Sequence, residues 1–303
     1  MPKNHCDIDV RFFRPPPEYD GLFASFYRAE IRVRDGGRVV DHLLPEWGNV
    51  RLFRGDMPDA ELSNGSRLSN APFVCTGPSS IPTRFELGTT RIWGIGLFPL
   101  GWAKFIGSPA KDVANLVVDG DAHAAFGGFS ALFRDLLAGE PDDEAEYARI
   151  MAFLRAKNAR LVPDEERIRA VQLALVDPAI STVAEFAARS GLGQRTLERV
   201  CGRYFGFPPR LLLRRQRFIR SLVGFMLEPS TSWTRSIDGL YHDQAHFVRD
   251  FRSFMGMTPS EYAALDHPVL GAFMQERARI WGAAAQTLDN PGPQTSSGLA
   301  SPE

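Results

Sequence analysis

The segment Phe247-Val248-Arg249, with Gly256-Met257-Thr258-Pro259 after it, repeats a pattern that begins 50 residues earlier, Leu197-Glu198-Arg199 with Gly206-Phe207-Pro208-Pro209. In both copies an arginine stands seven residues before a glycine, and a proline follows that glycine three residues later. A short amphipathic stretch and a glycine-containing turn precede each copy. This order is typical of a helix-turn-helix, in which a supporting helix and a turn of about four residues lead into a second helix with exposed polar side chains.

Helical spacing predicts which side chains of each second helix face outward. Leu197 and Val200 belong to the core in the first copy, as do Phe247 and Phe251 in the second. In the major groove, arginine can form two hydrogen bonds with guanine, and glutamine can form two with adenine. The outward residues are therefore candidates for DNA contact. Arg199 and Arg249 have an alternative role, as ion-pair partners inside the protein. The predicted contacts from the two second helices are Gln194, Arg195, Thr196, Glu198, Arg199, Asp243, Gln244, Ala245, Val248 and Arg249.

A helix over 210–228 is expected to join the two copies. At 1.5 Å per residue it is about 27 Å long, which suits two units that read sites roughly 34 Å apart, one turn of DNA. Its buried side is expected to contain Leu211, Leu212, Phe218, Leu222 and Phe225, and its arginines are spread around it. We expect Arg214 and Arg215 to contact phosphates, which gives affinity without sequence preference.

Charge is unevenly distributed along the 303 residues. The whole chain has a formal charge of −1, whereas residues 181–262 contain twelve arginines, no lysine and seven acidic residues, a net charge of +5. A basic segment in an otherwise acidic chain indicates contact with nucleic acid at one end.

The second copy, Asp243 to Arg252 and Gly256 to Tyr262, resembles the signature of the AraC/XylS family of transcriptional regulators nearly residue for residue. The resemblance covers 163–262 and implies two helix-turn-helix units that read adjacent major-groove segments of double-stranded DNA. Gly193, Cys201 and Leu240 depart from the family pattern. The front of the chain resembles more weakly an uncharacterised β-rich domain found before such units, through Arg14 to Glu18, Leu44-Pro45-Glu46 and Gly94 to Pro99. In the family such domains bind a small effector, mediate dimerisation, or both.

The predicted fold class is α+β, because short strand-like stretches up to about residue 121 give way to helical periodicity. We expect a β-rich barrel or sandwich-like sensor or dimerisation domain over 1–128, a helical linker over 129–162, the double helix-turn-helix domain over 163–265, and a helix with a disordered tail over 266–303. Within the front domain, 35–37 looks like a hairpin turn between two strands, 23–31 and 39–44. Other expected strands are 50–53, 73–76, 84–87, 91–98 and 116–118; expected helices include 129–138, 144–157 and 269–286, with a disordered tail from 287.

Several classes of protein are disfavoured. Cys6, Cys75 and Cys201 are too far apart for a disulfide framework or a CxxC metal site, and Cys75 reads as a buried, inert thiol. The N-terminus lacks the apolar core of a signal peptide, and the longest uncharged stretch, 92–103, is too short to span a bilayer. We therefore expect a cytoplasmic protein without a membrane contact, a cofactor, a metal or catalytic residues.

The interpretation is a sequence-specific transcription factor. Possible partners beside DNA are a small effector, a second copy of the chain and RNA polymerase. The aromatic residues of the front domain could line an apolar effector pocket or could equally well form an ordinary core. The alternatives are a cupin-like metal enzyme, for which His42 and His123 lack the usual spacing, and a methyltransferase with a reactive cysteine. His242 and His246 lie four apart, as zinc ligands do, but they lack a third ligand.

Overall fold

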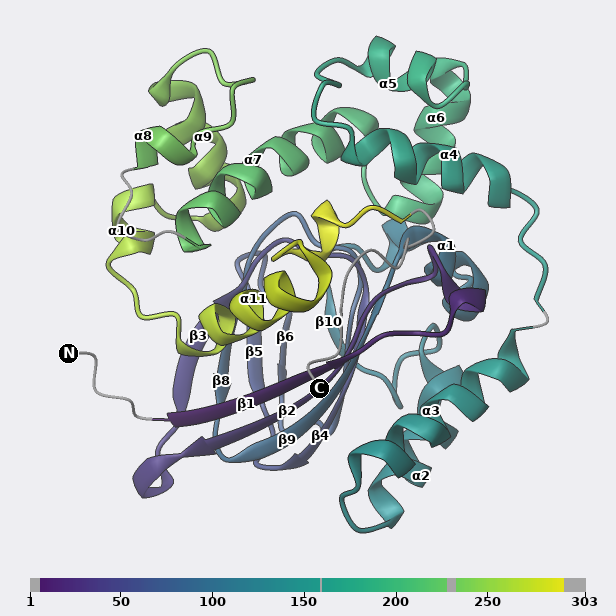
Figure 1. Ribbon diagram of the computed structural model, residues 1–303, viewed down its shortest axis with the longest axis vertical. Coiled ribbons are helices and arrows are strands. Elements are labelled where there is room, and N and C mark those ends of the chain that lie inside the picture. Colours follow the sequence, from purple (N-terminus) through teal and green to yellow (C-terminus); the bar gives the residue numbers. More distant parts are fainter. Residues whose placement is uncertain (1–5, 159, 228–232, 292–303) are drawn as a thin grey trace, which may run out of the picture.

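The structure is a computed structural model and describes residues 6–158, 160–227 and 233–291. The N-terminal part of the chain forms two antiparallel sheets, and most of the helices follow these sheets in the sequence (Figure 1). One sheet has the order β1 (Cys6–Phe13), β2 (Phe23–Val33), β9 (Thr90–Leu97), β4 (Asn49–Gly55), β7 (Phe73–Thr76) and β10 (Val117–Asp119). The other has the order β3 (Val39–Leu43), β8 (Thr83–Leu87), β5 (Asp59–Leu62) and β6 (Arg67–Ser69).

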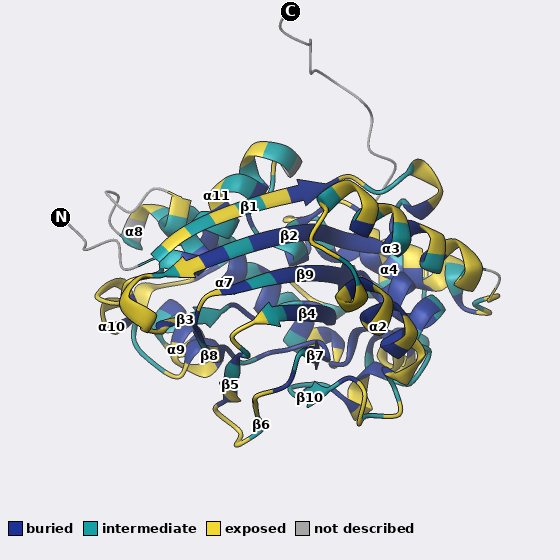
Figure 2. Ribbon diagram, turned by 90° about the horizontal axis from the view of Figure 1, so that it is seen from below, coloured by how far each residue is buried: buried dark blue, intermediate teal, exposed yellow. Residues whose placement is uncertain are grey.

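The predicted mixed fold is confirmed, and so are the predicted strands, within two residues at their ends. The strands β1, β5 and β6 are additional. The first of these is an edge strand whose exposure alternates along most of its length, whereas β2 and β9 are covered on both faces (Figure 2). The predicted hairpin at 35–37 is wrong, because β2 pairs with β1 and β9 while β3 pairs with β8. Asp35 and Gly36 adopt left-handed φ values there, and the chain passes from one sheet to the other.

The helical half follows the predicted order closely. The connecting helix α7 (Pro209–Leu227) is one continuous element that begins at a proline, and the predicted residue Glu228 lies outside the described residues. The other helices are α1 (Pro99–Gly101), α2 (Ser130–Ala138), α3 (Asp143–Lys157), α4 (Glu165–Val176), α5 (Val183–Arg189), α6 (Gln194–Val200), α8 (Trp233–Ser236), α9 (Gln244–Met255), α10 (Pro259–Ala263) and α11 (Pro268–Trp281).

The hydrophobic core connects the two halves of the chain. Side chains of the first helical unit, including Phe186, Leu197 and Phe205, share one apolar cluster with the β-sheet half. The second unit has its own cluster around Phe218, Phe251 and α10. The helix α7 contributes to both clusters, so the two units and the sheets are held by continuous apolar contact.

Residues 266–291, which we call the C-terminal strap, fold back onto the sheets. The helix α11 contacts β1 and β3, which are edge strands of the two different sheets, and so it spans the gap between them (Figure 1). Asp41 in β3 caps this helix by accepting hydrogen bonds from the backbone nitrogens of Val269 and Leu270, at 3.0 and 2.8 Å. The predicted disorder from residue 287 is wrong for 287–291, because Thr287 and Asp289 are buried. The remainder, 292–303, lies outside the described residues.

Candidate nucleic-acid interface

The first helix-turn-helix unit consists of α5, a short turn and α6. Thr182 and Glu185 form a capping box at the start of α5, in which each side chain accepts a hydrogen bond from the other residue's backbone nitrogen. Gly191 has a φ of +66°, which a glycine adopts without strain, and this lets the chain reverse between the helices. Gly193 begins α6 without a side-chain cap, as its departure from the family pattern implies.

The predicted orientation of α6 is confirmed. Leu197 and Val200 are fully buried, while Gln194, Arg195 and Glu198 are exposed. Gln194 Nε2 donates to Glu198 Oε1 at 3.1 Å, so these two residues form a polar pair on the outer surface. Arg195 forms no hydrogen bond or ion pair with the described part of the chain, and its guanidinium is available to a ligand. The neighbouring Thr196 is half-buried.

Arg199 has an internal partner. Its guanidinium nitrogens lie 3.0 and 3.3 Å from the carboxylate oxygens of Asp164, and Tyr204 donates its hydroxyl to the same carboxylate at 3.1 Å. Hydrogen bonds, first of all from Arg199, lower the pKa of Asp164 to about 2. Of the two roles considered for Arg199, the structure favours the ion pair, which ties α6 to the start of α4.

The second unit has a longer turn than predicted. The helix α8 ends at Ser236 and α9 begins at Gln244, so seven residues separate them. Gly239 does not adopt a left-handed φ, in line with the displacement of this glycine relative to the family pattern. Asp243 caps α9 by accepting a hydrogen bond from the backbone nitrogen of His246 at 2.6 Å, a structural role that was not foreseen.

On α9, Phe247 and Phe251 are buried as predicted. Gln244, Ala245 and Arg249 are exposed, and Val248 is half-buried. Arg249 has no hydrogen-bond or ion-pair partner among the residues that the structure describes. The outer face of α9 therefore presents one amide, one cation and two small apolar groups.

A buried carboxylate anchors α9 to α7. Asp250 accepts hydrogen bonds from Arg214 Nη2 at 2.7 Å, Arg217 Nη2 at 2.8 Å and the Tyr241 hydroxyl at 3.2 Å. The two arginines lower the pKa of Asp250 despite its burial. Arg214 stays partly exposed beside its carboxylate, so its proposed phosphate contact stays a prediction.

The predicted phosphate contact of Arg215 is wrong. Its side chain is 0% exposed and lies between α7 and the sheets, where Nη1 donates to the backbone oxygens of Ser79 at 3.0 Å and Glu46 at 3.4 Å. The guanidinium also stacks on Trp47, 4.0 Å from the ring centre. Burial lowers the pKa of Arg215 to about 9. Helical spacing alone does not distinguish Arg215 from the solvated arginines of α7. The sheets that cover this face of α7 belong to a distant part of the sequence.

The histidines considered as metal ligands lie in ordinary surroundings. The rings of His242 and His246 stack with their centres 5.8 Å apart, and His246 also contacts Arg217. His42 and His123 lie in different parts of the β-rich half. In the described ranges, histidine, cysteine, aspartate and glutamate side chains form no group of three or more that could hold a metal ion. Cys75 is a buried thiol as predicted, and burial raises its pKa.

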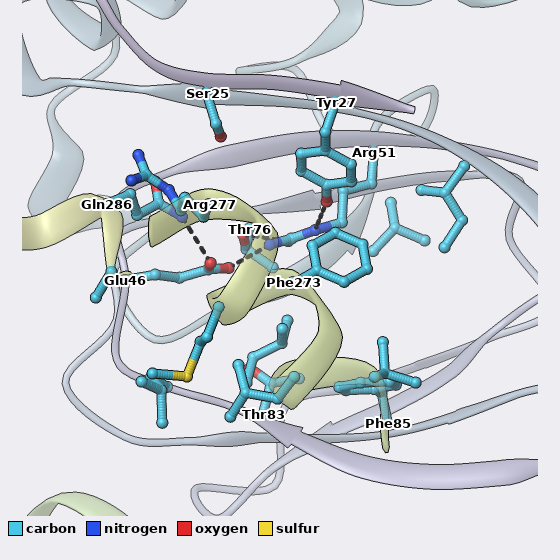
Figure 3. A pocket seen from close by; sticks show the side chains of 18 of the residues that line it. Ser25, Tyr27, Glu46, Arg51, Thr76, Thr83, Phe85, Phe273, Arg277 and Gln286 are labelled. Carbon is cyan, nitrogen blue, oxygen red and sulfur yellow. Dashed lines mark hydrogen bonds and ion pairs between the residues drawn. The ribbon is translucent and has the colours of Figure 1, made fainter. Parts of the chain in front are cut away.

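A cavity of about 140 Å³ lies between the two sheets and the C-terminal strap (Figure 3). Glu46, Arg51 and Gln286 form a chain of polar contacts at one end: Arg51 Nη2 lies 2.5 Å from Glu46 Oε1, and Gln286 Nε2 donates to Glu46 Oε2 at 2.8 Å. The Tyr27 hydroxyl accepts a hydrogen bond from Arg51 Nε at 3.0 Å. The aromatic residues left a pocket open as an alternative, and Phe12 and Tyr27 do line this cavity. Its polar end was not predicted, because Glu46 and Gln286 are 240 positions apart.

The same glutamate joins the cavity to the helical half. The carboxylate of Glu46 faces the cavity, while its backbone oxygen accepts the hydrogen bond from Arg215 of α7. The strap makes a second connection, since Gln216 in α7 donates to the backbone oxygen of Thr287 at 2.7 Å. The cavity is thus linked to α7 from two of its walls.

Comparison with known proteins identifies the helical half. Residues 186–264 match the model of a helix-turn-helix domain, a span that includes both copies of the repeated pattern. The chain is therefore a DNA-binding protein of the helix-turn-helix class. With two such units on one connecting helix behind a β-rich half, it has the arrangement that the resemblance to AraC-type regulators of transcription implies.

Solved structures give weaker likenesses over most of the chain. ToxT from Vibrio cholerae O395 is 12% identical, with 86% of this chain and 98% of ToxT covered and a TM-score of 0.41. ToxT from strain SCE256 with a bound unsaturated fatty acid is 13% identical, covers 77% and 96%, and gives 0.38. CuxR, an AraC-like transcriptional activator, is 16% identical, covers 71% and 86%, and gives 0.26. No curated protein matches the chain. None of the helices in the described ranges has the length and apolar character needed to cross a bilayer.

Proposed function

We propose that the chain reads two consecutive major-groove segments of double-stranded DNA with α6 and α9, and that this binding regulates transcription. The observation that carries the proposal is the pairing pattern of the arginines. Arg199, Arg214 and Arg217 are held by buried or half-buried carboxylates, whereas Arg195 and Arg249, one on each second helix, are exposed and without a partner in the described residues.

The two helices lie at opposite ends of α7, away from the sheets (Figure 1). The length of α7, about 27 Å, suits a separation of roughly one DNA turn. We assign base contacts to Arg195, Gln194, Gln244 and Arg249, and apolar contact with thymine methyl groups to Ala245 and Val248. The other predicted contacts are Thr196 and Glu198 on α6 and Arg214 on α7, which stay predictions.

The proposal is tested by DNA binding of the full chain. A DNA fragment is first selected from a random pool with the wild-type protein, and its affinity is measured by fluorescence anisotropy. The double variant Arg195→Ala/Arg249→Ala should lose most of the difference in affinity between selected and unrelated DNA. Arg67→Ala, an exposed arginine in β6, is the control and should bind as the wild type does. Unchanged discrimination in the double variant would contradict the proposal.

The β-rich half is proposed to sense a small effector and to mediate dimerisation. The contacts of Glu46 and of the strap with α7 support the first role, because a molecule in the cavity touches groups that also hold the connecting helix. We keep 1–128 as the sensor domain, 129–162 as the linker and 163–265 as the DNA-binding domain. The function is binding, not catalysis, and its setting is the cytoplasm, with a second copy and RNA polymerase as further partners.

A further inference from the structure

The cavity is built from segments far apart in the sequence. Inward-facing side chains of both sheets line it, and α11 of the strap supplies Val269 and Phe273 (Figure 3). Most of the wall is apolar, with Phe12, Phe53 and Phe85 among its residues. A cavity of about 150 Å³ with such a lining binds benzene, so about 140 Å³ corresponds to a compact ligand of about the size of one ring.

The charged side chains of the wall already have partners within the protein. Arg51 is paired with Glu46 at 2.5 Å, and Arg277 Nη1 donates to Asp289 Oδ1 at 2.8 Å. An anion entering the cavity would lose its hydration without meeting an unneutralised cation, which is costly. The wall therefore favours an uncharged molecule.

Two buried amide oxygens lack hydrogen-bond donors, one on Gln286, which lines the cavity, and one on Asn49 behind it. Asn49 Nδ2 donates to the backbone oxygen of Trp47 at 2.8 Å and Gln286 Nε2 donates to Glu46, so the orientation of both amides is fixed by their nitrogens. Their oxygens, Asn49 Oδ1 and Gln286 Oε1, are buried and accept no hydrogen bond from the described residues. Leaving such acceptors unpaired costs about 1–3 kcal/mol each.

These oxygens converge on one place. A Cβ atom at Gly96 would lie 2.7 Å from Ser25 Oγ, 2.9 Å from Gln286 Oε1 and 3.1 Å from Asn49 Oδ1. Ser25, Gly96 and Asn49 are paired neighbours on β2, β9 and β4, and Ser25 lines the cavity. The absence of a side chain at Gly96 lets these three oxygens pack closely over its backbone, and two of the residues, Ser25 and Gln286, line the cavity.

We infer that the cavity between the sheets and the C-terminal strap binds a compact, uncharged, mainly apolar molecule that carries one hydrogen-bond donor, of the kind a phenolic hydroxyl supplies. The donor points to the polar end of the cavity, toward Gln286 Oε1 and Ser25 Oγ, and the ring lies among the aromatic side chains of the sheets and α11. This rests on the proposed sensor role of the β-rich half and names the chemistry of its ligand.

The test compares three probes of nearly the same shape. Isothermal titration of the full chain at pH 7 uses 4-methylphenol, toluene and 4-methylbenzoate as ligands. We expect saturable binding of 4-methylphenol, binding of toluene about fivefold to tenfold weaker because one hydrogen bond is missing, and no binding of 4-methylbenzoate at the same concentrations. Tighter binding of the benzoate than of the phenol, or no binding of any probe, would overturn the inference.

Variants locate the donor site. Ser25→Ala and Gln286→Leu should reduce the preference for 4-methylphenol over toluene while toluene still binds. The control Gln275→Leu, at an exposed position of α11, should preserve the preference. An unchanged preference in both cavity variants would place the donor elsewhere and contradict the inference. Affinity for selected DNA is measured on the same proteins without ligand. Intact DNA binding with no phenol binding would reject the ligand class alone, whereas loss of DNA selectivity in the wild type would reject the proposed function.

Discussion

The arginines of the helical half fall into two groups according to their nearest carboxylate. Those that hold the helices together contact Asp164, Asp250 or Asp238, and those on the outer faces of α6 and α9 have no such contact in the described residues. Both groups contain members that spacing alone places on a polar helix face. The difference between them comes from acids on neighbouring helices, so it becomes visible only in the fold.

Replacing Arg195 by alanine is expected to remove a base contact. The affinity for the selected DNA should fall by about 1–3 kcal/mol, and the preference at one base position should relax. The measurement is a competition titration with DNA fragments that differ at single positions. A uniform loss on all fragments would instead assign Arg195 to the phosphate backbone.

Replacing Arg215 by alanine is expected to lower the stability of the fold and to leave the electrostatic part of DNA binding unchanged. The substitution leaves a cavity beside Trp47 and removes a donor from two backbone oxygens, which should lower the free energy of unfolding by about 2–4 kcal/mol. The slope of DNA affinity against salt concentration should stay that of the wild type. A shallower slope would contradict the buried position.

At the scale of single helices, the start of α9 depends on Asp243. Asp243→Ala should lower the free energy of unfolding by about 1 kcal/mol, because the backbone nitrogen of His246 loses its partner. Asp243→Asn keeps the cap and should retain most of the stability, as urea unfolding would show. If both variants are as stable as the wild type and both change the DNA preference, then Asp243 contacts DNA and does not stabilise the helix.

The contact between α4 and α6 should depend on pH through Asp164. Its pKa is lowered to about 2 in the folded chain, below the usual value near 3.9. The stabilisation is therefore complete above about pH 4 and is lost as the pH falls toward 2. Asp164→Asn should lower the free energy of unfolding by about 1–3 kcal/mol at pH 7, and this difference from wild type should shrink below pH 4.

The matched control for Asp164 is Asp266→Asn, an exposed aspartate outside the helices. Its difference from wild type should be small and nearly independent of pH. A pH-independent deficit in Asp164→Asn would mean that the carboxylate charge is not what holds Arg199.

The positions of the helices and strands along the chain were more predictable from the sequence than the contacts between them. Periodicity located α6, α7, α9 and most strands, because a buried face leaves a local pattern in the sequence. It failed at 35–37, where turn residues connect two sheets instead of two paired strands. It also missed the edge strand β1 and the short strands β5 and β6. It could not foresee that Arg215 faces the sheets or that Glu46 meets Gln286, since both depend on contacts between residues more than 100 positions apart.

At the scale of the whole molecule, the position of the strap is the feature that the sequence predicts least. Val269 to Gln286 was expected to contain one more helix, but no pattern indicated that this helix would span the edges of both sheets and complete a cavity. The strap follows α10 directly, so the same stretch of chain that closes the cavity also ends the second DNA-reading unit. The proposed ligand site and the proposed DNA site are thereby joined through one continuous segment.

The central claim is that α6 and α9 read two adjacent sites on one face of DNA. The most direct measurement is selection from a random DNA pool with the full chain, followed by sequencing of the bound fragments. We expect two conserved blocks whose centres lie about 10–10.5 base pairs apart, with Arg195→Ala relaxing one block and Arg249→Ala the other. A pool without enrichment, or a single block that neither substitution changes, would contradict the claim.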